Sequence, residues 1–309
     1  MNPFINKTEA RLRAGYRIII YIFCVFIVIG VGLSIPMGGW EYIFATVFSL
    51  GFSWVSFRFI DNRSTLEIAG LNLEKQWWIE SGLGALIAAL VMGIIFIIQL
   101  MFGTIEILGY SWGQPGTSSW GYPVLLFFVQ MVSVGFYEEL MMRSYLIPNF
   151  IEGFSFKKID AKTSVVIAVF FSSSIFGIAH GLNPNVTFFS ILNIVLAGVM
   201  LAIPYLITGR LAYSVGIHFA WNFFQGGVFG FRVSGRAING SLIQLKQGGD
   251  QFLTGGSFGP EGGLIGTIGI LLVMCLCFLL IKQTGIALEI HQNFKKSYLE
   301  FEVLTKENE

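Results

Sequence analysis

The chain has 309 residues, of which 54% are hydrophobic and only 12% are charged. Soluble domains carry about twice that fraction of charged residues, so the composition excludes an ordinary soluble globular domain. The formal net charge of +1 and the lack of a basic patch with interleaved aromatic residues argue against nucleic acid as a partner.

Apolar runs follow one another along the chain, and short polar segments separate them. We predict eight membrane-spanning helices, at residues 17–35, 41–58, 79–103, 123–146, 164–180, 188–207, 211–230 and 263–285. Each run is long enough, or nearly so, to cross about 30 Å of hydrocarbon at about 1.5 Å per residue. The sequence therefore predicts an all-α fold, a polytopic transmembrane helical bundle in contact with membrane lipid.

Short connections between the runs indicate one bundle, which we divide into three regions. Residues 1–122 hold spans one to three, and residues 123–230 hold spans four to seven. Residues 231–309 hold a Gly-rich loop, the last span and a polar tail. We interpret the loop, residues 231–262, as an irregular flexible connector, with a cap over a cavity as the alternative.

The distribution of lysine and arginine predicts the orientation of the bundle. If the N-terminus is cytoplasmic, fifteen of these residues fall on the cytoplasmic side, and only Arg232, Arg236 and Lys246 fall on the other. Cytoplasmic segments of membrane proteins are enriched in Lys and Arg. We therefore predict a multi-pass integral protein of a bacterial plasma membrane with both termini in the cytoplasm.

Three charged residues interrupt the fourth apolar run, at Glu138, Glu139 and Arg143. A charged side chain within a membrane costs about 2.5–3.5 kcal/mol on insertion scales, so it normally pairs, faces a wet cavity or takes part in chemistry. Glu139 and Arg143 are four residues apart on a helix and can pair. Glu138 points about 100° away and lacks a partner nearby in the sequence.

Two of the three histidines also lie in apolar runs. His180 follows Phe176 by four residues, and His218 precedes Asn222 by the same spacing, so each pair shares a helix face. A single polar residue in a span is commonly a satisfied helix–helix contact. Ionisable groups on three separate spans are harder to explain in that way, and they predict a shared polar site.

These residues form three short motifs that resemble those of a known family. E-E-x-x-x-R (Glu138–Arg143), F-x-x-x-H (Phe176–His180) and H-x-x-x-N (His218–Asn222) resemble the signature motifs of the CPBP family of intramembrane proteases. That family comprises CAAX-processing and bacteriocin-processing (Abi) proteins related to the Ras-converting CAAX endopeptidase. The resemblance covers about residues 120–230, in the order of the family's motifs. It implies an intramembrane endopeptidase in which Glu138 is catalytic and spans four to seven form the catalytic core.

Peptide hydrolysis requires an activated water, a donor to the carbonyl oxygen and a proton for the leaving amine. A carboxylate in a low-dielectric cavity is a stronger base, which suits Glu138. We expect Glu139, held by Arg143, to support the site, His180 and His218 to act with Glu138 on the water, and Asn222 to donate to the oxyanion. The supporting set also includes Phe176.

Two forms of this chemistry remain open at the level of sequence. In one, Glu138, His180 and His218 bind Zn²⁺ and water takes the fourth position. In the other, Glu138 is a metal-free general base, His180 positions the water, and His218 and Asn222 stabilise the oxyanion. The spacing of His180 and His218 from charged residues that flank their spans predicts a site nearer the cytoplasmic half of the membrane.

The expected substrate is a membrane-associated peptide or protein, such as a CAAX-type tail, a leader peptide or a propeptide. A transporter or proton relay is one alternative, because such proteins also place Glu and His within the membrane. A non-catalytic immunity or scaffold protein is another. The sequence leaves the oligomeric state undetermined.

Overall fold

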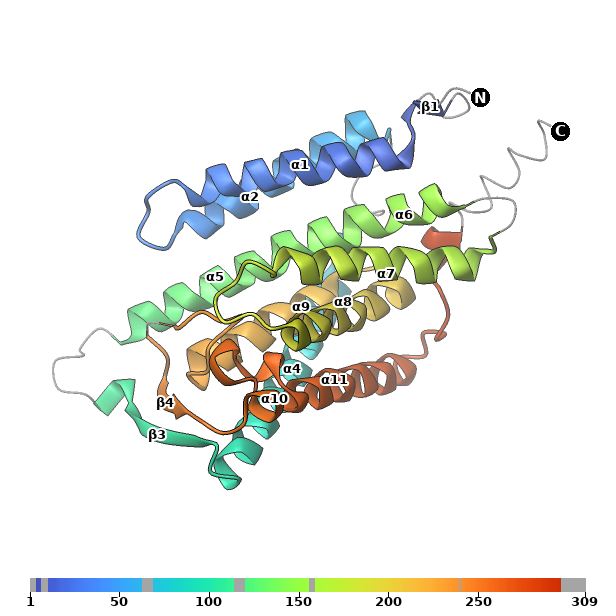
Figure 1. Ribbon diagram of the computed structural model, residues 1–309. Coiled ribbons are helices and arrows are strands. Elements are labelled where there is room, and N and C mark those ends of the chain that lie inside the picture. Colours follow the sequence, from blue (N-terminus) through green and yellow to red (C-terminus); the bar gives the residue numbers. More distant parts are fainter. Residues whose placement is uncertain are drawn as a thin grey trace.

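The computed structural model describes residues 4–6, 11–62, 69–113, 120–155, 159–238 and 240–295, and helices dominate it (Figure 1). The α-helices are α1 (Ala14–Leu33), α2 (Glu41–Val55), α4 (Lys75–Met101), α5 (Gly121–Glu139), α6 (Ile147–Phe154), α7 (Ala161–Ala179), α8 (Phe188–Thr208), α9 (Ala212–Asn222), α10 (Gln251–Thr254) and α11 (Leu264–Gln283). Two short antiparallel ribbons join β1 (Ile5–Asn6) to β2 (Arg11–Leu12), and β3 (Ile105–Tyr110) to β4 (Ile243–Gln247). The prediction of an all-α helical bundle is confirmed, and the two short ribbons are an addition that no sequence pattern predicted.

Three of the helices change to π-helical winding at their C-terminal ends. The π-helical segments are η1 (Ser56–Ile60) after α2, η3 (Leu140–Leu146) after α5 and η4 (Phe223–Val228) after α9. Because η3 runs on into α6, one long helix extends from Gly121 to Phe154. π-Helical turns are frequent at functional sites, and two of these begin directly after the motif residues Glu139 and Asn222.

Seven helices of the described residues are long and apolar enough to cross a membrane, so the chain is an integral membrane protein. The predicted span 211–230 is the exception. It forms α9 followed by η4, and together these run only from Ala212 to Val228, which is shorter than the predicted span. Nearly every residue of α9 is buried, and the helix packs against α4, α5 and α8. Among the described residues, the bundle therefore has seven long helices and a shorter, buried one in place of the predicted span 211–230.

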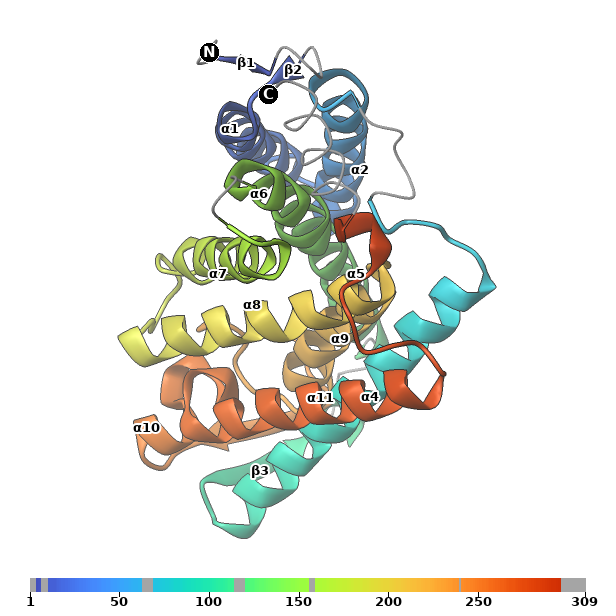
Figure 2. The ribbon, with the colours of Figure 1, turned by 90° about the vertical axis from the view of Figure 1, so that its right-hand side faces the viewer.

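The helices form layers that are visible in two views (Figures 1 and 2). The α1–α2 hairpin packs on α5 and α6, and α6 packs on α7. Helix α8 then contacts α7, α9 and α11, while α11 also contacts α4. We call the end with β1 and the segment His291–Lys295 the terminal end, and the end with β3 and β4 the distal end (Figure 1).

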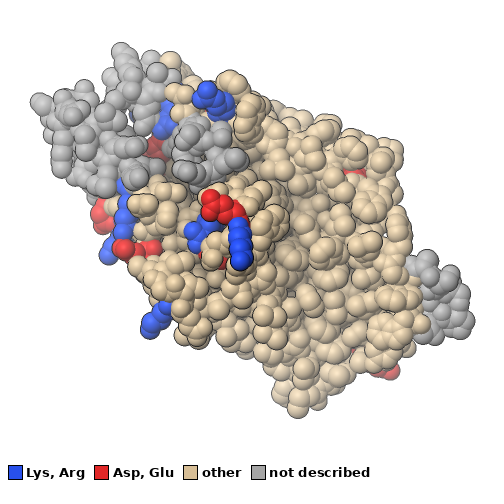
Figure 3. Space-filling model, turned by 180° about the vertical axis from the view of Figure 1, so that it is seen from behind, with Lys and Arg blue, Asp and Glu red and all other residues tan. Residues whose placement is uncertain are grey.

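The outer faces of the helices remain apolar. Exposed side chains include Ile19 and Phe23 on α1, Leu90 on α4, and Val166 and Phe170 on α7. Figure 3 shows that charged side chains gather mainly at one end of this face and that most of the rest is free of charge. Such a surface is unfavourable in water but suited to the hydrocarbon core of a bilayer.

The Gly-rich segment 231–262 differs from the predicted flexible connector. It forms β4, the short helix α10 and two 3₁₀ turns, η5 (Gly256–Phe258) and η6 (Pro260–Gly262). Another 3₁₀ turn, η2 (Ser111–Gly113), lies outside this segment, directly after β3. Its polar backbone groups bond to the bundle, since Gln225 at the end of the central helix donates to the Arg232 carbonyl at 2.7 Å. The segment is a folded cap, as in the alternative interpretation.

More charged groups are buried than the sequence suggested. The apolar runs contain Glu138, Glu139, Arg143 and two histidines as their conspicuous ionisable residues. The structure adds an ion-pair cluster in which Arg17 binds Asp61 and Glu152. Arg17 and Asp61 are both fully buried. The cluster joins α1, the end of η1 and α6, so it attaches the N-terminal hairpin to the long helix.

We expect Arg17→Met to destabilise the protein by about 3–5 kcal/mol, because it leaves the fully buried Asp61 carboxylate without its cation, while Glu152 keeps Arg11 at 3.0 Å. Thermal unfolding in detergent would measure the change. Lys295→Met is the matched control, since Lys295 and Glu289 form an exposed pair, and exposed pairs contribute little to stability. Equal shifts of the unfolding temperature in the two variants would contradict the structural role of the cluster.

Candidate active site

Glu138 and Glu139 lie at the end of α5, directly before the π-helical segment η3. The two side chains have different surroundings, as their 100° separation on the helix requires. The side chain of Glu138 is 19% exposed and that of Glu139 is 0% exposed. The Glu138 Oε2 atom has no hydrogen-bond partner among the described residues. Glu138 thus has an oxygen without a hydrogen-bond partner, and its side chain is the more exposed of the two.

The buried Glu139 carboxylate joins two of the three motifs. Its Oε1 atom lies 3.1 Å from Arg143 Nη1, in the predicted i,i+4 ion pair. The same atom lies 2.8 Å from His218 Nδ1 on α9. A carboxylate paired with arginine is ionised and can only accept, so His218 carries a hydrogen on Nδ1. Glu139 therefore sets the orientation of His218, a function that sequence reasoning did not assign to it.

The close contact between α5 and α9 depends on a glycine. A Cβ atom at Gly135 would lie 3.0 Å from the Phe219 backbone nitrogen, which is tighter than most Cβ contacts. Without that side chain the two helices approach closely enough for Glu139 to reach His218. The other ring nitrogen of His218, Nε2, lies 3.8 Å from Glu138 Oε2. That separation is too long for a direct hydrogen bond.

Phe176, the first residue of the second motif, contacts residues of the other two motifs. Its ring packs edge-on against His180, with ring centroids 4.9 Å apart, and against His218 at 5.8 Å. The Arg143 guanidinium lies 4.5 Å from the centre of the same ring, within the range of a cation–π interaction. Phe176 is thus the apolar contact point of the three motifs.

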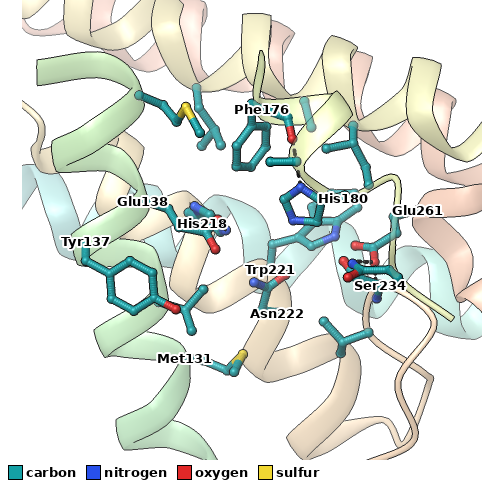
Figure 4. A pocket seen from close by; sticks show the side chains of 18 of the residues that line it. Met131, Tyr137, Glu138, Phe176, His180, His218, Trp221, Asn222, Ser234 and Glu261 are labelled. Atoms are coloured by element: carbon teal, nitrogen blue, oxygen red, sulfur yellow. Dashed lines mark hydrogen bonds and ion pairs between the residues drawn. The ribbon is translucent and has the colours of Figure 1, made fainter. Parts of the chain in front are cut away.

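His180 is the first residue after α7, and its ring is held by a hydrogen bond to the preceding turn of that helix. Its Nδ1 atom lies 2.8 Å from the Phe176 carbonyl oxygen. A carbonyl oxygen only accepts, so Nδ1 carries the hydrogen and Nε2 has a free lone pair when the ring is neutral. Figure 4 shows the ring of His180 beside Trp221 and near Ser234 and Glu261.

The four candidate catalytic residues line one cavity of about 300 Å³. Glu138, His180, His218 and Asn222 reach it from α5, α7 and α9 (Figure 4). The volume is at the lower end of the range for ligand sites. The structure therefore brings together the residues that the three motifs placed on separate helices.

The distal cap supplies further residues of the cavity that sequence reasoning missed. Ser234 and Glu261 both line it. The Ser234 backbone N–H and hydroxyl both donate to Glu261, the hydroxyl at 2.9 Å, and Asn193 donates to the Glu261 carbonyl at 2.9 Å. Glu261 stands in a Gly- and Pro-rich loop without periodicity, so no pattern in the sequence distinguished it from a solvent-exposed carboxylate.

Burial changes the ionisation of Glu261. It raises the pKa of this carboxyl, and the hydrogen bonds from Ser234, the electrostatic influence of the nearby His180 and the hydrogen bond with Trp221 offset only part of the rise. An acid with a raised pKa holds its proton more tightly in the folded protein than in the unfolded chain. The folded protein therefore loses stability relative to the unfolded chain as the pH rises from about 4.3, the ordinary value for glutamate, through the raised value.

The cavity lies toward the distal end of the bundle. The predicted position nearer the cytoplasmic half of the membrane stays a prediction, because the structure contains no membrane. The cavity wall includes Asn183 in the α7–α8 connection and Ser234 and Glu261 in the cap. These connections follow the ends of α7 and α9 that point away from the terminal end. The cavity is thus bounded from the distal side.

Two ring nitrogens of the predicted zinc ligands are engaged in hydrogen bonds. Among the described residues, no three His, Cys, Asp or Glu side chains lie close enough together to hold a metal ion. Glu139 occupies Nδ1 of His218 and the Phe176 carbonyl occupies Nδ1 of His180. The three-ligand zinc form would therefore have to use the Nε2 atoms of both histidines together with Glu138, and it stays a prediction. We therefore derive the chemistry from the side chains alone.

A bundle of membrane-spanning helices around a cavity with a free carboxylate, two histidines and an amide defines an integral membrane protein with a buried polar centre. Residues 120–224 match the model of a family described as type II CAAX prenyl endopeptidase Rce1-like. This segment contains all three motifs, so the family prediction made from them is confirmed. At the level of the family, the match supports protease activity of the CAAX type. No curated protein and no solved structure shows a significant match to the chain.

We expect Glu261→Gln to remove a pH-dependent loss of stability. The unfolding temperature of the variant, relative to that of the unchanged protein, should rise as the pH increases from 4 to 8, because glutamine does not ionise. Glu289→Gln is the control, since its exposed pair with Lys295 lowers the pKa of Glu289 and predicts the opposite trend. A temperature difference for Glu261→Gln that is constant across this range would contradict the burial argument.

Proposed function

We propose that the protein is an intramembrane endopeptidase that hydrolyses a peptide bond with a water molecule activated by Glu138. One observation carries the proposal. Glu138 Oε2 has no hydrogen-bond partner among the described residues, and it lies 3.8 Å from His218 Nε2 on the wall of the cavity. A separation of this size leaves room for one bridging water.

The first step is attack of this water on the substrate carbonyl carbon. Glu138 accepts one proton of the water while the oxygen forms a bond to the carbon. The Nδ1 hydrogen of His218 is donated to Glu139, so the Nε2 lone pair can accept a hydrogen bond from the other O–H of the water. This hydrogen bond fixes the position of the water. This arrangement favours a role for His218 in binding the attacking water. The metal-free form predicted from the sequence instead gave His218 the role of stabilising the oxyanion.

The developing oxyanion requires a donor that is already in place. Asn222 lines the cavity one helical turn beyond His218, and its amide N–H groups can donate to this oxygen. The tetrahedral intermediate then breaks its carbon–nitrogen bond. Glu138 returns its proton to the leaving amine, which gives a carboxylic acid and an amine, and the acid then passes its remaining proton to the amine to leave a carboxylate and an ammonium group. His180, whose Nε2 lone pair faces the cavity, accepts from the amine N–H and orients it.

Glu139, Arg143 and Phe176 are positioning residues in this scheme. They hold the ring of His218 and the end of α5 without touching the substrate. Arg143 also donates to the Gly198 carbonyl on α8 at 3.2 Å, so the positions of three helices depend on it.

The substrate in this proposal is a membrane-associated peptide, such as a CAAX-type tail, a leader peptide or a propeptide. The family description supports the first of these classes. We place the terminal end of the bundle in the cytoplasm, following the excess of lysine and arginine there. The cap over the cavity then faces the opposite side of the membrane.

We expect Glu138→Gln to lower kcat at least about 10²-fold, because glutamine keeps the shape but cannot accept the proton. The assay is cleavage of a prenylated CAAX peptide by purified protein in lipid vesicles. Glu106→Gln is the matched control, since Glu106 forms an exposed pair with Lys246 outside the cavity. Undiminished cleavage by the Glu138 variant would refute the assignment.

Metal analysis of the same preparations distinguishes the two forms of the chemistry. The metal-free form predicts cleavage that persists in a chelator and zinc well below one equivalent per chain. Activity that disappears in the chelator and returns with added zinc would support the three-ligand form instead.

We expect Asn222→Ala to lower kcat about 10²–10³-fold with little change in KM, because an oxyanion donor contributes about 2.7–4 kcal/mol to the transition state alone. Asn183→Ala is the control, since Asn183 lines the same cavity from the α7–α8 connection. A larger effect on KM than on kcat would show that Asn222 binds substrate and does not stabilise the oxyanion.

A further inference from the structure

A second hollow continues from the cavity toward the distal end. Its volume is about 450 Å³, and its walls come from the α1–α2 connection, the start of α5 and the cap. Tyr42, Met131, Val233 and Arg236 line both this hollow and the cavity. We call the second hollow the distal groove. The two hollows therefore adjoin one another at these four residues.

Arg236 is the charged side chain of the distal groove. Among the described residues that line the groove, the others are apolar or uncharged. Arg236 is exposed, and its guanidinium forms no ion pair with any described residue. By contrast, Arg17, Arg143 and Arg210 each pair with a glutamate. A cation without a partner at the junction of two hollows is available to an anionic group of a ligand.

The backbone that carries Arg236 is a tight turn. Val233 N–H donates to the Arg236 carbonyl at 3.0 Å, and Arg236 N–H donates to the Val233 carbonyl at 2.9 Å. Ser234 and Gly235 between them have φ values of 47° and 82°, which is the pattern of a type I′ turn. A Cβ atom at Gly235 would lie 1.7 Å from the Pro184 carbonyl oxygen, so only glycine fits against the α7–α8 connection.

Further contacts fix this turn to the cap. Gly235 N–H donates to the Phe258 carbonyl at 2.7 Å, and Asn185 donates to the Gly235 carbonyl at 3.2 Å. Ser234 is bound to Glu261 through both its backbone and its side chain. The turn is thus held from three sides, and the Cα of Arg236 has a fixed position from which the guanidinium reaches the groove.

The charge of Arg236 lies close to the catalytic centre without pairing with it. The hydroxyls of Tyr42 and Tyr137 are each within electrostatic range of both Arg236 and Glu138. The guanidinium of Arg236 and the carboxylate of Glu138 form no ion pair with one another. Glu138 keeps its unpaired oxygen, and the guanidinium is left for a second anion.

We propose that Arg236 binds a carboxylate of the peptide substrate, in the part of the chain that extends from the scissile bond into the distal groove. This inference rests on the proposed endopeptidase function and specifies the substrate. A guanidinium binds a carboxylate with two parallel hydrogen bonds, which fixes the carboxylate in orientation as well as in distance. The carboxylate belongs either to the C-terminus of the peptide or to an acidic side chain. Arg236 is then a specificity-determining residue.

Three labelled, prenylated CAAX peptides distinguish these sources. The first has a free C-terminal carboxylate, the second a C-terminal amide, and the third an amide with glutamate as its last residue. Binding is measured by fluorescence anisotropy to the Glu138→Gln protein in vesicles, and cleavage is measured with the protein that retains Glu138. Each assay is repeated with Arg236→Gln, Arg236→Lys and the control Arg232→Gln. Arg232 lies in the same segment, but it lines neither hollow.

We expect Arg236→Gln to weaken binding of the free-carboxylate peptide about tenfold to a hundredfold, as for a charge-assisted hydrogen-bonded pair. The amide peptide should bind equally to both proteins, and Arg236→Lys should retain part of the difference. Recovery of binding by the third peptide identifies an acidic side chain as sufficient, and its failure identifies the C-terminus as the source. In the cleavage assay the loss should appear in KM, with kcat little changed.

Equal weakening of all three peptides by Arg236→Gln, or no weakening, would overturn this inference, whatever the outcome of the cleavage assay. Binding that depends on Arg236 without any cleavage would instead refute the endopeptidase function and leave the carboxylate site standing. Failure of all three peptides to bind would count against both.

Discussion

The site depends on one buried carboxylate that two cationic or polar groups share. Glu139 is fully buried and contacts Arg143 and His218 through the same oxygen atom. A glutamate in the interior of a membrane protein is stable only when its charge is compensated, so both partners must stay in place. Arg143 belongs to the long helix and His218 to the central one. The electrostatic requirement of a single side chain thus fixes the distance between the helices that carry the chemistry.

This compensation leaves the neighbouring carboxylate free. Arg143 and His218 Nδ1 are committed to Glu139, so Glu138 Oε2 remains without a partner among the described residues and faces the cavity. Glu138 and Glu139 therefore have separate roles, as base and as anchor, which a single residue could not combine. A base must be accessible to water, whereas an anchor must be shielded from it. Phe176 supplies that shielding by covering Arg143 and His218 with one ring.

The motif residues were predictable because charge is rare in apolar runs. Glu138, His180 and His218 stand out against their neighbours in the sequence, and helical spacing relates Asn222 to His218. Arg17 and Asp61 escaped notice because they flank spans, where charges normally face water. Ser234 and Glu261 escaped for a different reason: they stand in a Gly-rich segment without period, and only tertiary hydrogen bonds bury them. The π-helical segments likewise follow from packing, which no local pattern encodes.

The cap also explains the charges that count against the predicted orientation. Three cationic residues, Arg232, Arg236 and Lys246, fall on the side with few such charges. Each has a local role: Lys246 pairs with Glu106 across the β3–β4 ribbon, Arg232 donates to the Gly235 carbonyl, and Arg236 lines both hollows. Charges used within a folded cap say little about which side of the membrane a loop occupies, because orientation follows the excess in short flanking segments. The cationic excess at the terminal end is therefore the more informative signal, since its exceptions have structural causes.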